Sequence, residues 1–127
     1  MVDEVIIYKI VTREQWDEAE AAGVFKGAPV DLADGYIHFS TADQVIETAA
    51  RHFAGQADLL LVAVDADALG EALICEPSRG GQLFPHLYAD LPLSAIRSIA
   101  PLPLADGRHQ FSAAMNPAGR SGRPITR

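Results

Sequence analysis

One histidine and two hydroxyl side chains lie close together in a short stretch, residues 34–41, which reads Asp-Gly-Tyr-Ile-His-Phe-Ser-Thr. The imidazole of His38 can hydrogen-bond a sugar or phosphate oxygen, and Ser40 and Thr41 place two hydroxyls beside it. The stretch alternates like a half-buried strand, and Thr41 then begins a segment with helical periodicity. Such strand-to-helix junctions bind ligands because the first N–H groups of a helix have no partner within it. We therefore expect a ligand site here, with one of the two hydroxyls used as the helix N-cap.

A second group of polar side chains follows at residues 76–88. His86 and Tyr88 are one residue apart, so on a strand they would face the same side and offer an imidazole for ribose or phosphate and a ring for stacking. Glu76 ends an apolar segment, where a carboxylate can stabilise positive charge at a sugar carbon or hold a ribose hydroxyl. Arg79 lies in a glycine-rich loop and can bind a phosphate. Each of these residues also has a simpler structural explanation. His86 and Tyr88 could form an aromatic-rich strand edge, and Glu76 and Arg79 could be solvated surface residues.

Several familiar catalytic patterns are missing from the chain. It contains no Gly-x-Ser-x-Gly elbow, no P-loop and no His-Glu-x-x-His motif. Its four histidines are far apart and lack the short ligand spacing of structural zinc sites. We therefore expect that the protein binds no metal. The alternative is a metal site formed in the folded chain by His38, Glu76 and His86.

The elements that must position these side chains indicate an α+β fold. Capping-box patterns at Thr12 and Thr41 predict two main helices, the first ending at Gly23 and the second near Gly55. Apolar runs predict short strands, without the regular alternation of a parallel α/β protein. Residues 5–11 are expected to form a central strand, and residues 24–33 a loop or short edge strand. The remaining strands are expected at residues 59–64, 73–77, 83–88 and 96–102.

Length and charge restrict the classes of function. The 127 residues are expected to form a single domain over residues 1–111, followed by a disordered basic tail at 112–127. The formal net charge is −7, and an acidic protein repels a phosphate backbone, so nucleic acid is an unlikely partner except as one locally held RNA end. No run approaches the ~20 apolar residues of a membrane span. The lone Cys75 points to a reducing, cytoplasmic setting.

The sequence contains several short motifs: "DGYIHFST" at residues 34–41, "FPHLY" at residues 84–88, Tyr8-Lys9-Ile10 and Trp16. In these motifs it resembles the bacterial domain-of-unknown-function family 952. The resemblance runs from about Val5 to Leu104. That family is similar in fold to the ADP-ribosyltransferase group, which includes the RNA 2′-phosphotransferases. The resemblance thus implies two small, bent, mostly antiparallel sheets with an NAD-type cleft between them.

The resemblance also suggests roles for individual residues. His38 matches the histidine that contacts the nicotinamide ribose, and Tyr88 or Tyr36 would supply the stacking ring. No Gln-x-Glu motif occurs, and the one Glu-x-Glu, Glu18-Ala19-Glu20, lies on the polar face of the first predicted helix rather than on a strand. Glu76 is therefore a substitute for the glutamate of that group. The expected catalytic residues are His38, Glu76 and His86. The expected contacts to an NAD-type or ADP-ribose-like nucleotide come from His38, Ser40, Thr41, Arg79, His86 and Tyr88.

The predicted function is therefore that of a nucleotide-binding protein, with transferase or glycohydrolase chemistry at a ribose or its 2′-phosphate. A non-catalytic nucleotide-binding module is the main alternative, and a metal-binding or protein-interaction domain is the lesser one. The expected partner is a small-molecule nucleotide. The sequence leaves the oligomeric state open.

Overall fold

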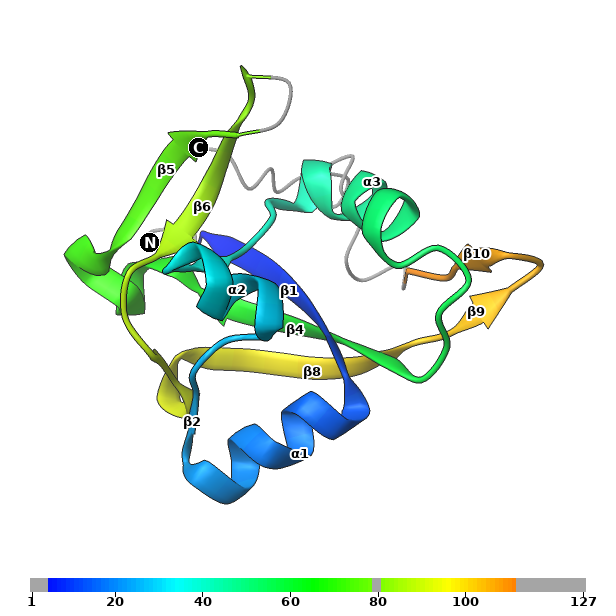
Figure 1. The fold of residues 1–127 in the computed structure, drawn as a ribbon, viewed down its shortest axis with the longest axis horizontal. Coiled ribbons are helices and arrows are strands. Elements are labelled where there is room, and N and C mark those ends of the chain that lie inside the picture. The colour runs from blue at the N-terminus through cyan, green and yellow to red at the C-terminus, as the bar shows by residue number, and fades with distance from the viewer. Residues whose placement is uncertain (1–4, 79–80, 112–127) are drawn as a thin grey trace.

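Two three-stranded antiparallel sheets form the centre of the fold (Figure 1). The computed structural model describes residues 5–78 and 81–111; the tail predicted at 112–127 lies outside them. The larger sheet has the order β1 (Ile6–Thr12), β4 (Leu59–Asp65), β8 (Ile96–Leu102). The smaller has the order β3 (Ile37–His38), β6 (Leu83–Leu87), β5 (Leu73–Pro77).

Shorter elements complete the described part of the chain. Strand β2 (Val24–Phe25) pairs with β7 (Leu91–Pro92), and β9 (Leu104–Ala105) pairs with β10 (Arg108–His109). The 3₁₀ segments η1 (Ala66–Ala72) and η3 (Leu93–Ala95) precede β5 and β8. Several small antiparallel sheets combined with helices confirm the α+β class.

Helices α1 (Arg13–Ala22) and α3 (Ala42–His52) cover opposite faces of the larger sheet (Figure 1). Because side chains alternate along a strand, β1 contributes to two cores. Ile7 packs in one core with Trp16 of α1. Ile10 packs in the other with Val45 of α3. Strands β1 and β4 are therefore buried on both sides, which accounts for their nearly continuous apolar sequences, whereas β8 is largely exposed.

Both predicted helix starts are confirmed. Thr12 accepts the Gln15 N–H at 3.0 Å while its own N–H donates to the Gln15 side chain at 2.9 Å. Thr41 occupies the N-cap of α3, and its N–H donates to Oε1 of Gln44 at 3.0 Å. Gly23 ends α1 in the left-handed conformation with φ of 84°, which glycine adopts without strain. Helix α3 ends at His52, a little before the predicted Gly55.

Two of the sequence predictions about elements are wrong. Residues 5–11 were expected to form a central strand, but β1 lies at an edge of its sheet. The two helices cover its faces, and on its open side Tyr8 forms an isolated antiparallel bridge with Ser40. Residues 24–33 were expected to form a loop or a short edge strand. The short strand β2 agrees with this, but the residues after it form a helix, α2 (Pro29–Asp34), which was not predicted. Pro29 begins this helix and Gly35 ends it with φ of 92°. At six residues, α2 is too short to show helical periodicity.

Among the described residues, no helix is both long and apolar enough to cross a membrane.

Candidate functional site

Strand pairing in the smaller sheet brings together the two histidines that stand out in the sequence. His38 on β3 lies directly opposite His86 on β6 in the antiparallel register. Their ring centroids are 5.5 Å apart and their planes are inclined by 70°. Side chains opposite one another on paired strands share a face of the sheet. The two imidazoles therefore lie side by side on one face of the smaller sheet, although they are 48 positions apart in the sequence and His86 is buried.

His38 is held between two carboxylates. Its Nδ1 lies 2.6 Å from Oδ1 of Asp31, and its Nε2 lies 2.9 Å from Oδ2 of Asp34. The backbone N–H of His38 also donates to Asp31 Oδ1 at 3.0 Å. A neutral imidazole can donate from only one nitrogen, so this geometry matches the doubly protonated ring. Helix α2 carries both acids and fixes the ring orientation.

Asp31 is the most buried charged group of the site, with 2 % of its surface exposed. Its carboxylate accepts hydrogen bonds from Lys9 Nζ at 3.0 Å and from the N–H of Ala28 at 2.7 Å, in addition to those from His38. Burial alone would raise its pKa. The hydrogen bond from His38, the charge of Lys9 and the two backbone N–H groups outweigh burial and lower the pKa to about 2. Asp31 is therefore ionised at any physiological pH.

Lys9 lies in the middle of the apolar strand β1 and is 7 % exposed. Burial lowers the pKa of its ammonium group, and the attraction and hydrogen bond of Asp31 act in the opposite direction. The two oxygens of Asp31 both lie 3.0 Å from Nζ. The pair ties β1 to α2, and so holds α2, which binds His38 of β3, against the larger sheet.

His86 is also bound to a carboxylate. Its Nδ1 lies 2.7 Å from Oε1 of Glu76 on the neighbouring strand, and the same oxygen accepts the Tyr88 hydroxyl at 2.7 Å. The hydrogen bonds from His86 and Tyr88 lower the pKa of Glu76. That same bond to Glu76, aided by burial, raises the pKa of Tyr88 to about 12. Within the described residues, the other ring nitrogen of His86, Nε2, is buried and has no hydrogen-bond partner.

Tyr36 lies at the centre of an aromatic cluster. Its ring stacks on His86, with centroids 4.1 Å apart and planes inclined by 26°. It also contacts His38 at 4.7 Å and Tyr88 at 5.1 Å between centroids. Aromatic rings at these separations attract one another beyond simple area burial. The cluster therefore holds both imidazoles in place.

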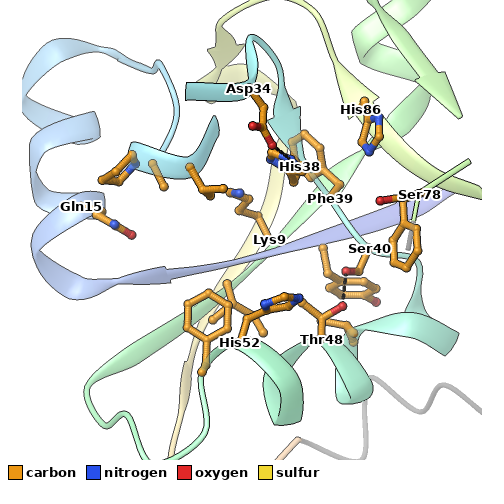
Figure 2. Close-up of a pocket in the computed structure, with 18 of the residues that line it drawn as sticks. Lys9, Gln15, Asp34, His38, Phe39, Ser40, Thr48, His52, Ser78 and His86 are labelled. Atoms are coloured by element: carbon orange, nitrogen blue, oxygen red, sulfur yellow. Dashed lines mark hydrogen bonds and ion pairs between the residues drawn. The ribbon is translucent and has the colours of Figure 1, made fainter. Parts of the chain in front are cut away.

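A pocket of about 640 Å³ opens beside the two histidines, between α2 and α3 and over β1 (Figure 2). In the close-up, His38, Lys9 and Gln15 lie along one side and Thr48 and His52 of α3 along the other. Apolar side chains make up much of the remaining wall: Tyr8, Ile10, Phe39, Val45, Phe53 and Phe84. An apolar concavity with a few polar groups on one wall is typical of small-molecule sites.

The site residues expected from the sequence divide into three groups. His38, Ser40 and His86 line the pocket, and Ser40 Oγ lies 2.9 Å from Oγ1 of Thr48. Glu76, Tyr88 and Thr41 are not among the lining residues: the first two bond each other next to His86, and Thr41 caps α3. Arg79 lies outside the described residues.

The network of charged residues around His38 was not predicted from the sequence: it consists of Lys9, Asp31 and Asp34. A lysine inside an apolar strand was the available signal, because a buried ammonium group requires a partner. Asp31 is that partner, 22 residues away. Among the described residues, no group of three or more histidine, cysteine, aspartate or glutamate side chains is arranged to hold a metal ion.

Comparisons with known proteins identify close relatives. The family described as "Protein of unknown function (DUF952)" matches residues 10–99. The crystal structure of protein CC0527 from Caulobacter crescentus is 52 % identical in sequence, with a TM-score of 0.82 over 87 % of this chain and 97 % of that one. The solution NMR structure of CC0527 from the same organism is 54 % identical, with a TM-score of 0.76 over 84 % and 92 % of the two chains. A comparison with curated proteins found no match. The chain therefore belongs to the DUF952 family.

Proposed function

We propose that the pocket binds a nucleotide of the NAD or ADP-ribose type, with its ribose against His38 and His86. The observation that carries the proposal is the register pairing of these two histidines at the wall of a 640 Å³ pocket. Two imidazoles whose Nδ1 atoms are bound by carboxylates are rigid groups suited to sugar hydroxyls. The resemblance to the ADP-ribosyltransferase group, in which a histidine contacts the nicotinamide ribose, supports the same placement of His38.

The rest of the pocket suits a ligand that is partly flat and apolar. Its volume falls within the ~300–1,000 Å³ of small-molecule sites. Phe39, Phe53 and Phe84 offer aromatic surface for a base or nicotinamide ring, and Gln15 offers an amide on the polar side. The phosphate contact predicted for Arg79 is part of the proposal.

If the site is catalytic, the chemistry proposed is transfer or hydrolysis at the ribose or its 2′-phosphate. His38 and His86 would hold the sugar. Glu76, which bonds Nδ1 of His86, would act through that ring to stabilise positive charge.

A binding-only module is the second candidate, and one observation favours it. Among the described lining residues the only carboxylate is Asp34, and it bonds His38. Glu76 therefore does not face the pocket directly, as a glutamate that supports a ribose carbon would have to. A protein of this kind would recognise the nucleotide and leave it intact.

A thermal-shift panel tests the binding proposal with NAD, ADP-ribose, a 2′-phosphorylated oligonucleotide and Zn²⁺. A ligand present at 100 times its Kd adds about 2.7 kcal/mol to the free energy of unfolding, which raises the Tm by several degrees. We expect a nucleotide to produce this shift in the wild type and in Glu18→Ala, an exposed α1 residue outside the pocket, but not in His38→Ala. The absence of a shift with every nucleotide, or an equal shift in His38→Ala, would overturn the proposal.

A second experiment separates the enzyme from the binder. Labelled NAD alone, a 2′-phosphorylated oligonucleotide alone with water as the acceptor, and the two together, so that NAD can accept a transferred phosphate, are each incubated with the protein and with His86→Ala. Release of nicotinamide or loss of the phosphate by the wild type alone would establish catalysis. Intact substrates together with a thermal shift would establish the binding-only module.

A further inference from the structure

The buried nitrogen Nε2 of His86 has a definite chemical character. Glu76 Oε1 is 2.7 Å from Nδ1 of the same ring and also accepts the Tyr88 hydroxyl. The lowered pKa of Glu76 keeps its carboxylate ionised at neutral pH, and an ionised carboxylate only accepts hydrogen bonds. The proton of the neutral imidazole therefore lies on Nδ1, and Nε2 carries a lone pair.

The fully protonated form of His86 fits its surroundings poorly. It would place an N–H donor at Nε2, which within the described residues is buried and faces no acceptor. The neighbouring His38, 5.5 Å away between ring centroids, is already held between two carboxylates in the geometry of a cation. A second cation beside it would be repelled. Both arguments favour a neutral His86 with an unused acceptor.

His86 lines the pocket, whereas Glu76, which holds its other nitrogen, does not. We propose that His86 recognises a hydroxyl group of the pocket ligand through Nε2 as hydrogen-bond acceptor, and that Glu76 is the positioning residue that fixes the ring proton on Nδ1. This deepens the proposed function and rests on it for the identity of the group, a ribose hydroxyl. An acceptor at this position selects a donor such as a hydroxyl and disfavours an ionised phosphate oxygen, which can only accept.

Access to this nitrogen requires a small rearrangement, because the atom has almost no contact with solvent. The ring of Tyr36 stacks on His86 at 4.1 Å and lies outside the regular strand, between Gly35 and β3. Glu76 and His38, by contrast, are held in paired strands. Tyr36 is thus the neighbour that can shift without breaking strand hydrogen bonds, and we expect its ring to move when ligand binds.

The first test needs no ligand and uses the full chain. Nitrogen-15 NMR of the histidine side chains reports which ring nitrogen carries the proton, and the His86 signals are assigned by their loss in His86→Gln. We expect a protonated Nδ1 and a bare Nε2. In Glu76→Gln the proton should redistribute toward Nε2, while the matched Glu18→Gln change on α1 should leave the signals unchanged. A protonated Nε2 in the wild type, or no effect of Glu76→Gln, would overturn the inference.

The second test adds ADP-ribose and an analogue in which the ribose hydroxyls are replaced by hydrogen. We expect the wild type to bind ADP-ribose about tenfold more tightly than the analogue, the worth of one good hydrogen bond. His86→Leu should lose this preference and His86→Gln, whose amide oxygen can accept, should partly restore it. An unchanged preference in His86→Leu would overturn the inference.

The two proposals fail in different ways. A protonated Nε2 together with normal ADP-ribose binding would overturn the role of His86 and leave the nucleotide site intact. An unprotonated Nε2 with no ADP-ribose binding would overturn the proposal that the ligand is a nucleotide. It would still support the proposal that Nε2 of His86 is a hydrogen-bond acceptor.

Discussion

His38 and His86 face each other across two antiparallel strands, and each has a carboxylate on its Nδ1. The distances are nearly equal, 2.6 Å to Asp31 and 2.7 Å to Glu76. The remaining nitrogens differ: Nε2 of His38 lies 2.9 Å from an exposed acid, Asp34, whereas Nε2 of His86 is buried and, in the described part of the chain, unpaired. Two similar rings are thus prepared for different contacts. The first suits a charged donor and the second a neutral acceptor.

Replacing Asp31 with asparagine should destabilise the fold strongly. The change leaves the ammonium group of Lys9 buried without its countercharge and weakens the bonds to His38. Breaking one side of a buried ion pair costs about 3–5 kcal/mol. Urea unfolding of Asp31→Asn should therefore show a midpoint well below that of the wild type, with an unchanged slope.

The exposed pair of Arg13 and Asp58, with N–O distance 2.9 Å, supplies the matched control. Asp58→Asn should leave the unfolding midpoint almost unchanged, because solvent screens exposed ion pairs. If the two variants lose equal stability, the buried network is not what holds α2 to β1.

Asp31 should also make the fold sensitive to acid. Its pKa is about 2 in the folded chain against 3.8 ordinarily, so its ionised form stabilises the fold above about pH 4. That contribution, about 2 kcal/mol, is lost as the pH falls toward 2. Urea unfolding measured at several pH values below about 5 should show a steeper loss in the wild type than in Asp31→Asn. If stability falls with pH equally in the wild type and in Asp31→Asn, Asp31 is not the group responsible for the acid sensitivity.

Gly27 should tolerate alanine worse than other glycines with positive φ. Its φ is 123°, and an added Cβ would lie 2.9 Å from Cβ of Asp31. Gly55 has φ of 77° with nothing within 4 Å of the added atom. Gly55→Ala should cost about 1–2 kcal/mol from the left-handed backbone alone, and Gly27→Ala a further ~1–3 kcal/mol from overlap. Equal unfolding midpoints would show that the turn before α2 can relax away from Asp31.

The structure predicts which tyrosine stacks on the ligand. Tyr36 lines the pocket, whereas Tyr88 is not among the lining residues and binds Glu76. Stacking on a base is worth about 1–3 kcal/mol, so Tyr36→Leu should weaken ADP-ribose binding by tenfold or more. Tyr88→Leu should weaken it less. Calorimetric titration that finds the larger loss in Tyr88→Leu would instead favour Tyr88, the other ring that the sequence offered.

Local patterns were sufficient to predict much of the fold. The capping boxes at Thr12 and Thr41 mark the true helix starts, and the strand at residues 96–102 has the predicted bounds. These features depend on neighbours within a few residues, which a sequence displays directly. The helix at Pro29–Asp34 is too short to produce a periodic pattern and was missed.

The site depends more on contacts between distant residues. The alternation around His38, and the spacing of His86 and Tyr88, indicated which side chains share a face, and the structure brings His38, Ser40 and His86 to one pocket. It also places both His86 and Tyr88 on Glu76. The link between Lys9 and Asp31 crosses from β1 to α2 and has no local signature. The direction of Glu76, toward His86, follows from the register of β5 with β6, which spacing alone does not determine.

The central claim is that the pocket between α2 and α3 binds a nucleotide. The most direct measurement is a nitrogen-15 NMR titration of the full chain with ADP-ribose, following the backbone N–H signals. We predict saturable shifts that concentrate at Tyr36, His38, Phe39 and His86 and spare the exposed face of α1. Signals that do not move, or shifts spread evenly over α1 and the pocket, would contradict a nucleotide site here.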